Sequence, residues 1–333
     1  MTSALENFAR TVGGPEEGPV TCRGGGTQWD LGGPADPTAR AVAAPSGVVD
    51  HQPGEMIVRV RAGTTIAELQ DVARSNGQLV AIEADRPDEA TVGGLLACGQ
   101  SGIRRLGRGP IRDTVLEVTA VSSAGRLVRA GAPLVKNVTG FDLCKLLVGS
   151  YGSLAFIAEV VLRCIPEPQT ERWFVGQDAD PFELRSRLYK PLSVLWDGRR
   201  TWVGLAGYEV DVAGQARSVL GAAFSEVDGP PQSNITERTL PVRLSMSPGD
   251  LRRLPSLAAT RDAPVGEWLA EVGVGVVHCT PTLAALVPGP APSASILELH
   301  RRLKASFDPS GRINPNRTPF VRSSRIQPFE EVG

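Results

Sequence analysis

The chain has few of the residues that metal centres and disulfide frameworks use. Its 333 residues include three histidines and five cysteines. The cysteines are far apart and form no CxxC pair, and His51, His278 and His300 do not have metal-ligand spacing. An odd number of scattered cysteines is typical of reduced, mostly buried thiols. We therefore expect no metal site and no iron–sulfur cluster held by this chain itself.

The chain also lacks an excess of one charge and a long apolar run. Its 35 basic and 36 acidic residues leave a net charge of −1, and basic residues cluster only in pairs such as Arg104–Arg105. This balance argues against a nucleic-acid binder that depends on phosphate contacts. No stretch approaches the roughly 18 apolar residues of a transmembrane helix, and the N-terminus does not resemble a signal peptide. We expect a cytoplasmic protein that reaches a membrane, if at all, through partners.

Glycine, in contrast, is abundant, with 37 residues, and it is concentrated in three segments. These are Gly24 to Thr27, Gly93–Gly94 followed by Gly99 to Gly102, and Gly149 to Gly152. A diphosphate needs backbone N–H groups without side chains in the way, and glycine permits that approach. None of the three segments is a Rossmann GxGxxG sequence or a P-loop. The alternative for each is an ordinary turn that packs against the protein.

Periodicity predicts a mixed chain of helices and strands. A helix is expected near the N-terminus, and another from Ile66 to Ser75, capped by Thr64 or Thr65. Leu154 to Ile165 predicts a buried strand that ends at Pro166. The other expected strands are 57–60, 113–120, 126–128, 201–208, 243–245 and 272–278, and the other expected helices are 143–147, 212–220 and 296–307, with a turn or helix at 266–270.

Four segments, in this order, resemble a known family. RGGGT, ATVGGLLACGQSG, VTGFDLCKLLVGSYGSLAFIAEVVLR and FDPSGRINPNR resemble the FAD-binding oxidoreductases of the vanillyl-alcohol oxidase (PCMH) type, and among them the FAD-binding E subunits of bacterial glycolate oxidases. The resemblance implies an α+β fold, in which a PCMH-type FAD-binding domain of two α/β subdomains carries a smaller α+β cap domain. After Pro168 the glycine clusters become rare, and expected strands alternate with helical stretches. We therefore expect the FAD-binding domain at 1–168, the cap at 169–292, and a C-terminal segment, 293–333, that returns to the FAD-binding domain.

The resemblance also implies which residues hold FAD. The residues placed along the diphosphate, ribityl chain, flavin and adenine are Gly24, Gly25, Gly26, Thr27, Thr91, Gly93, Gly94, Gly99, Ser101, Gly102, Val138, Thr139, Gly140, Ile157 and Asn314. Some relatives attach FAD through a histidine near the glycine turn. Here Gln28 and Trp29 follow Thr27, so we expect non-covalent FAD.

Candidates for chemistry on a substrate are few. His278 is a candidate general base, because its unperturbed pKa lies near 6.5; the alternative is a hydrogen-bonded structural histidine. A 2-hydroxy acid needs a cation for its carboxylate, and Arg243, Arg104 or Arg105 are candidates, each with a surface charge as its alternative. Related dehydrogenases have a histidine-rich stretch with acidic residues in the cap. The comparable stretch, 273–279, has one histidine, and no acidic partner is expected for it.

These features predict the FAD-binding subunit of a glycolate-oxidase-like complex. The subunit would oxidise glycolate or a related 2-hydroxy acid, or relay its electrons, together with a second flavin subunit and an iron–sulfur subunit. Two alternatives remain open: an FAD-loaded assembly subunit without catalytic activity, and a stand-alone oxidase.

Overall fold

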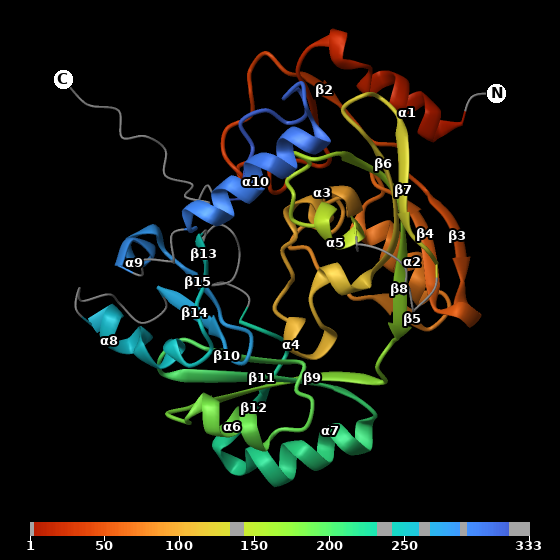
Figure 1. Cartoon of the computed structure of the whole chain (residues 1–333). Coiled ribbons are helices and arrows are strands. Elements are labelled where there is room, and N and C mark those ends of the chain that lie inside the picture. Colours follow the sequence, from red (N-terminus) through yellow and green to blue (C-terminus); the bar gives the residue numbers. More distant parts are fainter. Residues whose placement is uncertain (1–2, 134–142, 232–241, 260–266, 287–291, 320–333) are drawn as a thin grey trace. The chain divides into compact units, whose positions relative to one another are not determined.

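The computed structural model (Figure 1) describes residues 3–133, 143–231, 242–259, 267–286 and 292–319. The chain divides into two units. Unit 1 contains the described parts of Met1–Gly102, Pro110–Glu167 and Pro292–Arg322, and unit 2 contains those of Ile103–Gly109 and Pro168–Ala291. The α+β class that was expected from the sequence is confirmed, since both units combine helices with sheets.

Unit 1 is built on an antiparallel sheet and a smaller parallel pair of strands. The larger sheet has the order β3-β4-β8-β6-β7, with β5 also paired to β8, and the smaller sheet pairs β1 with β2. The elements of unit 1 are α1 (Ala4–Val12), β1 (Val20–Cys22), β2 (Arg40–Val42), β3 (Val48–Gln52), β4 (Ile57–Arg61), α2 (Ile66–Arg74), β5 (Gln78–Val80), α3 (Val92–Cys98), β6 (Val115–Val121), β7 (Leu127–Gly131), α5 (Leu143–Leu147), β8 (Phe156–Pro166) and α10 (Ala294–Phe307).

Strand β8 is the centre of unit 1, as its apolar sequence predicts. It pairs with β4, β5 and β6, and eight of its eleven residues, all but Arg163, Ile165 and Pro166 near its exit, are buried on two covered faces. Helices α2, α3 and α5 contribute Leu69, Leu96 and Leu147 to the same core as Val160 and Leu162 of β8. Thr65 begins α2, because its side-chain oxygen accepts a hydrogen bond from the Glu68 N–H at 3.2 Å.

The C-terminal segment completes the smaller sheet of unit 1. Ile313 forms a parallel bridge with Val20 of β1. A network at the end of α10 fixes this return: Lys304 Nζ lies 2.6 Å from a carboxylate oxygen of Asp308, and the same oxygen accepts the Ile313 N–H at 2.8 Å. Residues almost 300 positions apart thus become neighbours on one side of unit 1.

Unit 2 is built on a seven-stranded antiparallel sheet. Its strand order is β12-β9-β11-β10-β14-β15-β13. The elements of unit 2 are α4 (Arg105–Arg108), β9 (Thr170–Gln177), α6 (Pro181–Arg187), β10 (Ser193–Trp196), β11 (Arg200–Gly207), α7 (Glu209–Gln215), β12 (Phe224–Val227), β13 (Val242–Ser245), α8 (Leu254–Ala259), β14 (Trp268–Glu271), β15 (Val276–Cys279) and α9 (Pro281–Leu286).

The two faces of this sheet bury different sets of side chains. Helices α6 to α9 pack on one face around Val203, Leu205 and Val277. The other face carries a smaller cluster of Trp173, Leu195, Trp202 and Leu269. The expectation of a turn or helix at 266–270 was wrong, because residues 268–271 form β14 and pair on both sides. The strand expected at 272–278 begins only at Val276, after a turn.

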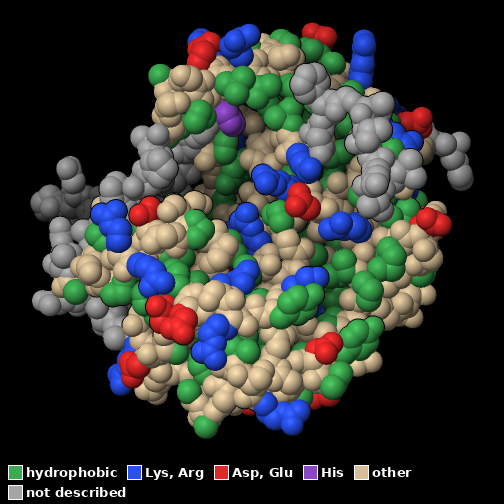
Figure 2. All heavy atoms as spheres, turned by 60° about the horizontal axis from the view of Figure 1, so that its bottom comes forward, with side chains coloured by type: hydrophobic (Ala, Val, Ile, Leu, Met, Phe, Trp, Pro, Cys, Tyr) green, Lys and Arg blue, Asp and Glu red, His purple; other side chains and the backbone are tan. Residues whose placement is uncertain are grey.

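The charges on the surface are mixed. On the face drawn in Figure 2, basic and acidic side chains occur next to each other among apolar ones. Among the helices that the structure describes, none is long and apolar enough to cross a membrane.

Candidate cofactor site

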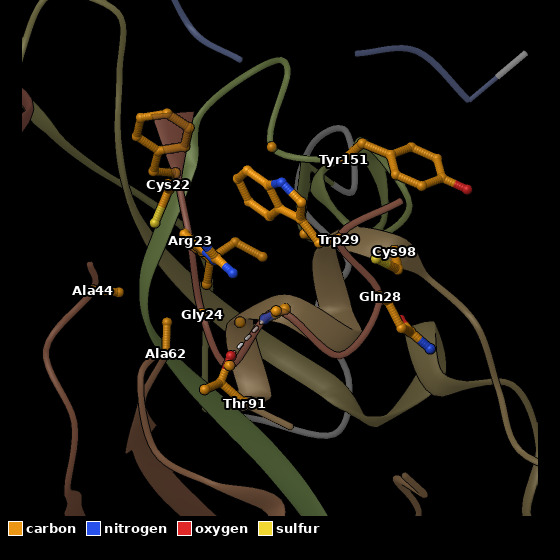
Figure 3. Close-up of a pocket in the computed structure, with 18 of the residues that line it drawn as sticks. Cys22, Arg23, Gly24, Gln28, Trp29, Ala44, Ala62, Thr91, Cys98 and Tyr151 are labelled. Atoms are coloured by element: carbon orange, nitrogen blue, oxygen red, sulfur yellow. Dashed lines mark hydrogen bonds between the residues drawn. The ribbon is translucent and has the colours of Figure 1, made fainter. Parts of the chain in front are cut away.

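Unit 1 contains an open cavity lined by the first glycine-rich segment. The walls come from the loop after β1, the N-terminal part of α3, the turn before β8 and the C-terminal return (Figure 3). In Figure 3, Cys22, Ala44 and Ala62 lie toward one end of the cavity, and Gln28, Cys98 and Tyr151 toward the other. The cavity has a volume of about 240 Å³. This is below the roughly 300–1,000 Å³ of pockets that enclose a drug-sized ligand, so it suits one portion of an elongated ligand.

The loop after β1 presents a run of backbone N–H groups. The N–H of Arg23 is bonded to Val42 and that of Trp29 to Gly26. Between them, the N–H groups of residues 24 to 28 have no hydrogen-bond acceptor among the described residues. All five of these residues line the cavity. Successive free N–H groups form an anion-binding concavity, so this loop fits a diphosphate.

The glycines of this loop are required by the protein itself as well as by a ligand. A Cβ atom on Gly25 would lie 1.7 Å from the carbonyl oxygen of Glu89, and one on Gly24 would lie 2.2 Å from Oγ1 of Thr91. Neither position accepts a side chain without movement of its neighbour. The loop therefore packs tightly against the segment before α3 while its N–H groups stay available.

Helix α3 forms the wall beside this loop. Thr91 begins the helix and accepts a hydrogen bond from the Gly94 N–H at 3.2 Å, drawn as a dashed line in Figure 3. Gly93 lies against Ala62, where a Cβ atom would come within 2.7 Å. A Cβ atom on Gly94 would meet only Oγ1 of Thr91, at 3.0 Å, among the described residues. Gly93 is thus explained by packing, whereas the space beside Gly94 is left open toward the cavity.

Unsatisfied polar atoms line the cavity near Trp29. Oε1 of Gln28 and both Nε and Nη2 of Arg317 are buried and have no hydrogen-bond partner in the part of the chain that the structure describes. Arg317 is held in place because Nη1 donates to the carbonyl oxygens of Trp29 and Leu31, both at 2.6 Å, and its guanidinium lies 4.3 Å from the centroid of a Trp29 ring. Burial lowers the pKa of Arg317, but an arginine stays charged. Unpaired buried donors and acceptors are costly, so a ligand that satisfies them is a good fit.

The two cysteines of the cavity lie at its opposite ends. Burial raises the pKa of the Cys22 thiol to about 12. Cys22 is therefore a protonated, weakly nucleophilic thiol at neutral pH. Cys98 ends α3. His51 does not line the cavity; its Nε2 lies 3.1 Å from Oε1 of Gln78.

Asn314 holds the walls of the cavity together. Its Oδ1 accepts from Oγ1 of Thr21 at 2.5 Å, and its Nδ2 donates to the carbonyl oxygen of Tyr151 at 2.7 Å. Its φ of 42° lies in the left-handed region, which asparagine tolerates better than most residues. Asn314 thus lines the site, but both ends of its side chain amide bond to the protein.

The structure brings most of the expected FAD-binding residues together. Those that line the cavity are Gly24, Gly25, Gly26, Thr27, Thr91, Gly93, Gly94, Ile157 and Asn314. Val138, Thr139 and Gly140 lie outside the described residues. Gly99, Ser101 and Gly102 do not line this cavity. A Cβ atom on Gly99 would lie 2.7 Å from Gly149, and Ser101 Oγ accepts the Ile111 N–H at 3.0 Å.

Sequence reasoning missed Arg317 and Trp29 as cavity residues. Arg317 follows the expected Asn314 by three positions, so the INPNR motif contained a signal for it. Trp29 was considered only as a residue that replaces a histidine. Tyr151 belongs to the third glycine-rich segment, Gly149 to Gly152, and both Tyr151 and Gly152 line the cavity.

In unit 2, His278 has an acidic partner, contrary to expectation. Its Nε2 lies 2.8 Å from Oε1 of Glu271, whose side chain is 2% exposed. Glu271 ends β14 and His278 lies on β15, so antiparallel pairing brings them together across the turn at 272–275. Arg243 of β13 is the directly paired neighbour of His278. The structure thus places both candidate substrate residues side by side.

Arg104 forms an ion pair with Glu171. Its Nη2 lies 2.6 Å from Oε1 of Glu171, and Arg108 pairs with the second oxygen at 3.2 Å. Although burial alone raises the pKa of Glu171, hydrogen bonds from Arg104 and Trp173 outweigh it and lower the pKa. Arg104 therefore neutralises a carboxylate of unit 2 itself.

Comparisons with known proteins show an FAD-binding family. A family model described as an FAD binding domain matches residues 14–131. Glycolate oxidase subunit GlcE of Escherichia coli is 31% identical over 328 residues, covering 90% of this chain and 92% of that protein. A D-lactate dehydrogenase of Archaeoglobus fulgidus is 36% identical over 45% of this chain but only 34% of its own length. A solved structure of alkyldihydroxyacetonephosphate synthase matches 93% of this chain with a TM-score of 0.67 and 16% identity, a likeness of fold alone.

Proposed function

Because the chain belongs to the family of FAD-binding E subunits of bacterial glycolate oxidase, within the PCMH-type FAD-binding oxidoreductases, we propose that it serves a complex that oxidises glycolate or a related 2-hydroxy acid. FAD is the cofactor of this family of oxidoreductases. The observation that carries the proposal for this chain is the run of five N–H groups at residues 24–28, which have no acceptor among the described residues and belong to residues that line the cavity of unit 1.

We propose that residues 24–28 hold the diphosphate of FAD, with α3 beside it. Gly94 leaves room for the ligand, and Arg317 and Gln28 supply a cation, free N–H donors and a free acceptor. Ala44, Ala62 and Ile157 form an apolar part of the cavity wall, against which an aromatic ring of FAD can pack. When bound, FAD supplies the acceptor for a hydride. This chain's residues bind and orient it.

The residues that we propose for chemistry on the substrate lie in unit 2, within the cap domain proposed at 169–292. Arg243 is proposed to bind the substrate carboxylate, because a guanidinium pairs with a carboxylate through two parallel hydrogen bonds. His278 is proposed to accept the hydroxyl proton.

Electrons must leave the flavin after each oxidation. The five scattered cysteines of the sequence offer no pattern for an iron–sulfur cluster. We propose that a second flavin subunit and an iron–sulfur subunit complete a complex, in the cytoplasm or attached to a membrane through these partners.

The first prediction is that FAD is bound without a covalent bond. The purified chain should be yellow with flavin absorbance near 450 nm, and acid precipitation should release all of the FAD into the supernatant. The physical reason is that no histidine is among the described residues that line the cavity, and that burial keeps Cys22 a neutral thiol by raising its pKa.

Two results would contradict the prediction of non-covalently bound FAD. Flavin that stays with the precipitate would overturn the non-covalent attachment and point to Cys98. A colourless chain that FAD cannot reconstitute would overturn the proposed function itself.

A further inference from the structure

The buried carboxylate of Glu271 is not explained by stability. Its side chain is 2% exposed, Oε1 lies 2.8 Å from Nε2 of His278, and Oε2 has no hydrogen-bond partner among the described residues. Its cross-strand neighbours are Leu195 on β10 and Val276 on β15. A half-satisfied carboxylate among apolar side chains is usually less favourable than a well-packed apolar residue. Violations of this kind are expected at functional sites.

The hydrogen bond to Glu271 decides which nitrogen of His278 is available. A carboxylate accepts, so Nε2 of the neutral imidazole carries the proton and Nδ1 carries the free lone pair. Nδ1 has no hydrogen bond to the described residues, and the side chain keeps 14% of its surface exposed. His278 is also the only histidine in the sequence of unit 2. The ring is thus held at Nε2, and part of the side chain remains exposed.

We propose that Glu271 is a positioning residue that makes His278 a general base through Nδ1. This inference rests on the proposed function. Oxidation of a 2-hydroxy acid breaks its O–H and Cα–H bonds and forms a carbon–oxygen double bond. Bound FAD would supply the acceptor for the hydride, and Nδ1 of His278 would take the hydroxyl proton. The imidazolium that results is stabilised by the carboxylate of Glu271 at Nε2, while Arg243 on the neighbouring strand serves the substrate carboxylate.

A substitution series separates this role from a structural one. In the FAD-loaded chain, anaerobic reduction by glycolate or D-lactate is followed at 450 nm. His278→Ala should slow reduction by roughly 10²–10⁴. Glu271→Leu should slow it by roughly 10² through loss of ring orientation, with unchanged FAD content and a melting temperature that is equal or higher. Glu271→Gln keeps an acceptor for the Nε2 proton, so it should retain more activity than Glu271→Leu.

The double variant Glu271→Leu/His278→Ala should be no slower than His278→Ala alone, because a positioning residue acts only through the group that it positions. A tautomer measurement adds a readout that is independent of activity. With three histidines in the chain, ¹⁵N-histidine spectra should show His278 protonated at Nε2 in the wild type and a mixture of tautomers in Glu271→Leu.

Several results would overturn the proposal. These are an Nδ1-protonated His278 in the wild type, additive rate losses in the double variant, or a Glu271→Leu chain that loses stability and keeps its rate. A yellow chain that no 2-hydroxy acid reduces would also overturn it, but would leave FAD binding intact and favour an assembly role.

Discussion

At the glycine-rich loop, neighbouring residues serve different physical needs. Gly25 has no side chain because the Glu89 carbonyl oxygen occupies the place of its Cβ atom. A Cβ atom on Gly94 would meet only Oγ1 of Thr91 among the described residues, at 3.0 Å, and Gly94 also lines the cavity. Arg317 and Gln28 add polar atoms that the protein itself does not satisfy. The contrast allows packing and ligand binding to be tested separately.

We predict that Gly94→Val loses FAD while the fold is retained. The added branch enters the space that the cavity leaves for the ligand, and overpacking of about 1–3 kcal/mol corresponds to roughly 5- to 150-fold weaker binding. Flavin absorbance per protein and far-UV circular dichroism would check this. Gly54→Val is the matched control, because a Cβ atom there meets nothing within 4 Å. Equal flavin content in Gly94→Val and wild type would reduce Gly94 to an ordinary helix residue.

At the scale of elements, the C-terminal return is fixed by a buried ion pair. Asp308, at the end of α10, accepts from Lys304, from the Ile313 N–H and from Ser310 Oγ at 3.0 Å. Lys304 Nζ also donates to the carbonyl oxygens of Ser153 and Ile313, both at 2.7 Å. The network connects α10 to the turn before β8 and to the bridge with β1. It therefore positions Asn314 and Arg317 at the cavity.

We predict that Asp308→Asn destabilises the chain by about 1–3 kcal/mol at pH 7, the usual cost of losing hydrogen bonds to a charged group. Burial raises the pKa of Asp308, but the bonds from Lys304 and Ile313 outweigh this and lower it below 3.8. When the pKa of a carboxyl group is lower in the folded than in the unfolded state, the ionised group stabilises the fold at pH values above the unfolded-state pKa. This stabilisation is lost as the pH falls through the folded-state pKa. Urea unfolding should thus show a difference between variant and wild type that shrinks below about pH 4.

The control for this series is Asp250→Asn, since Asp250 has a half-exposed side chain and only a 3.9 Å contact with Arg253. It should change the free energy of unfolding by less than about 0.5 kcal/mol. A difference for Asp308→Asn that stays constant from pH 7 to 3 would contradict the charge-based explanation.

At the scale of the whole molecule, the chain has a proposed flavin site and proposed substrate residues but no cysteine pattern for a cluster that would carry single electrons away. One reduction of bound FAD and sustained turnover are therefore different properties. The first depends on this chain, and the second on what accepts the electrons.

We predict that the isolated chain turns over glycolate with a dye weakly or not at all, and that co-expression with a second flavin subunit and an iron–sulfur subunit gives clear activity. A positioned acceptor should exceed a diffusing dye by roughly tenfold or more. Dye reduction by the purified chain and by the complex, at equal flavin content, measures this. Robust turnover by the isolated chain, abolished by His278→Ala, would instead favour a stand-alone oxidase.

The sequence by itself determined the features that depend on short stretches. Apolar runs and capping residues located β8, α2 and α10, because strand and helix periods are local. The RGGGT and ATVGG segments predicted a cradle that lines one cavity, because free N–H groups and missing side chains are also local properties.

Only the tertiary structure decided what depends on distant partners. Residues 99–102 read as a ligand loop, yet Gly99 is required by its approach to Gly149. Residues 266–270 read as a turn or helix, yet β14 forms because β10 and β15 supply hydrogen bonds on both sides. Glu271 became the partner of His278 by the same pairing, and Arg317 reached Trp29 across 288 positions of sequence. Such contacts depend on how the chain folds back on itself, so no local pattern contains them.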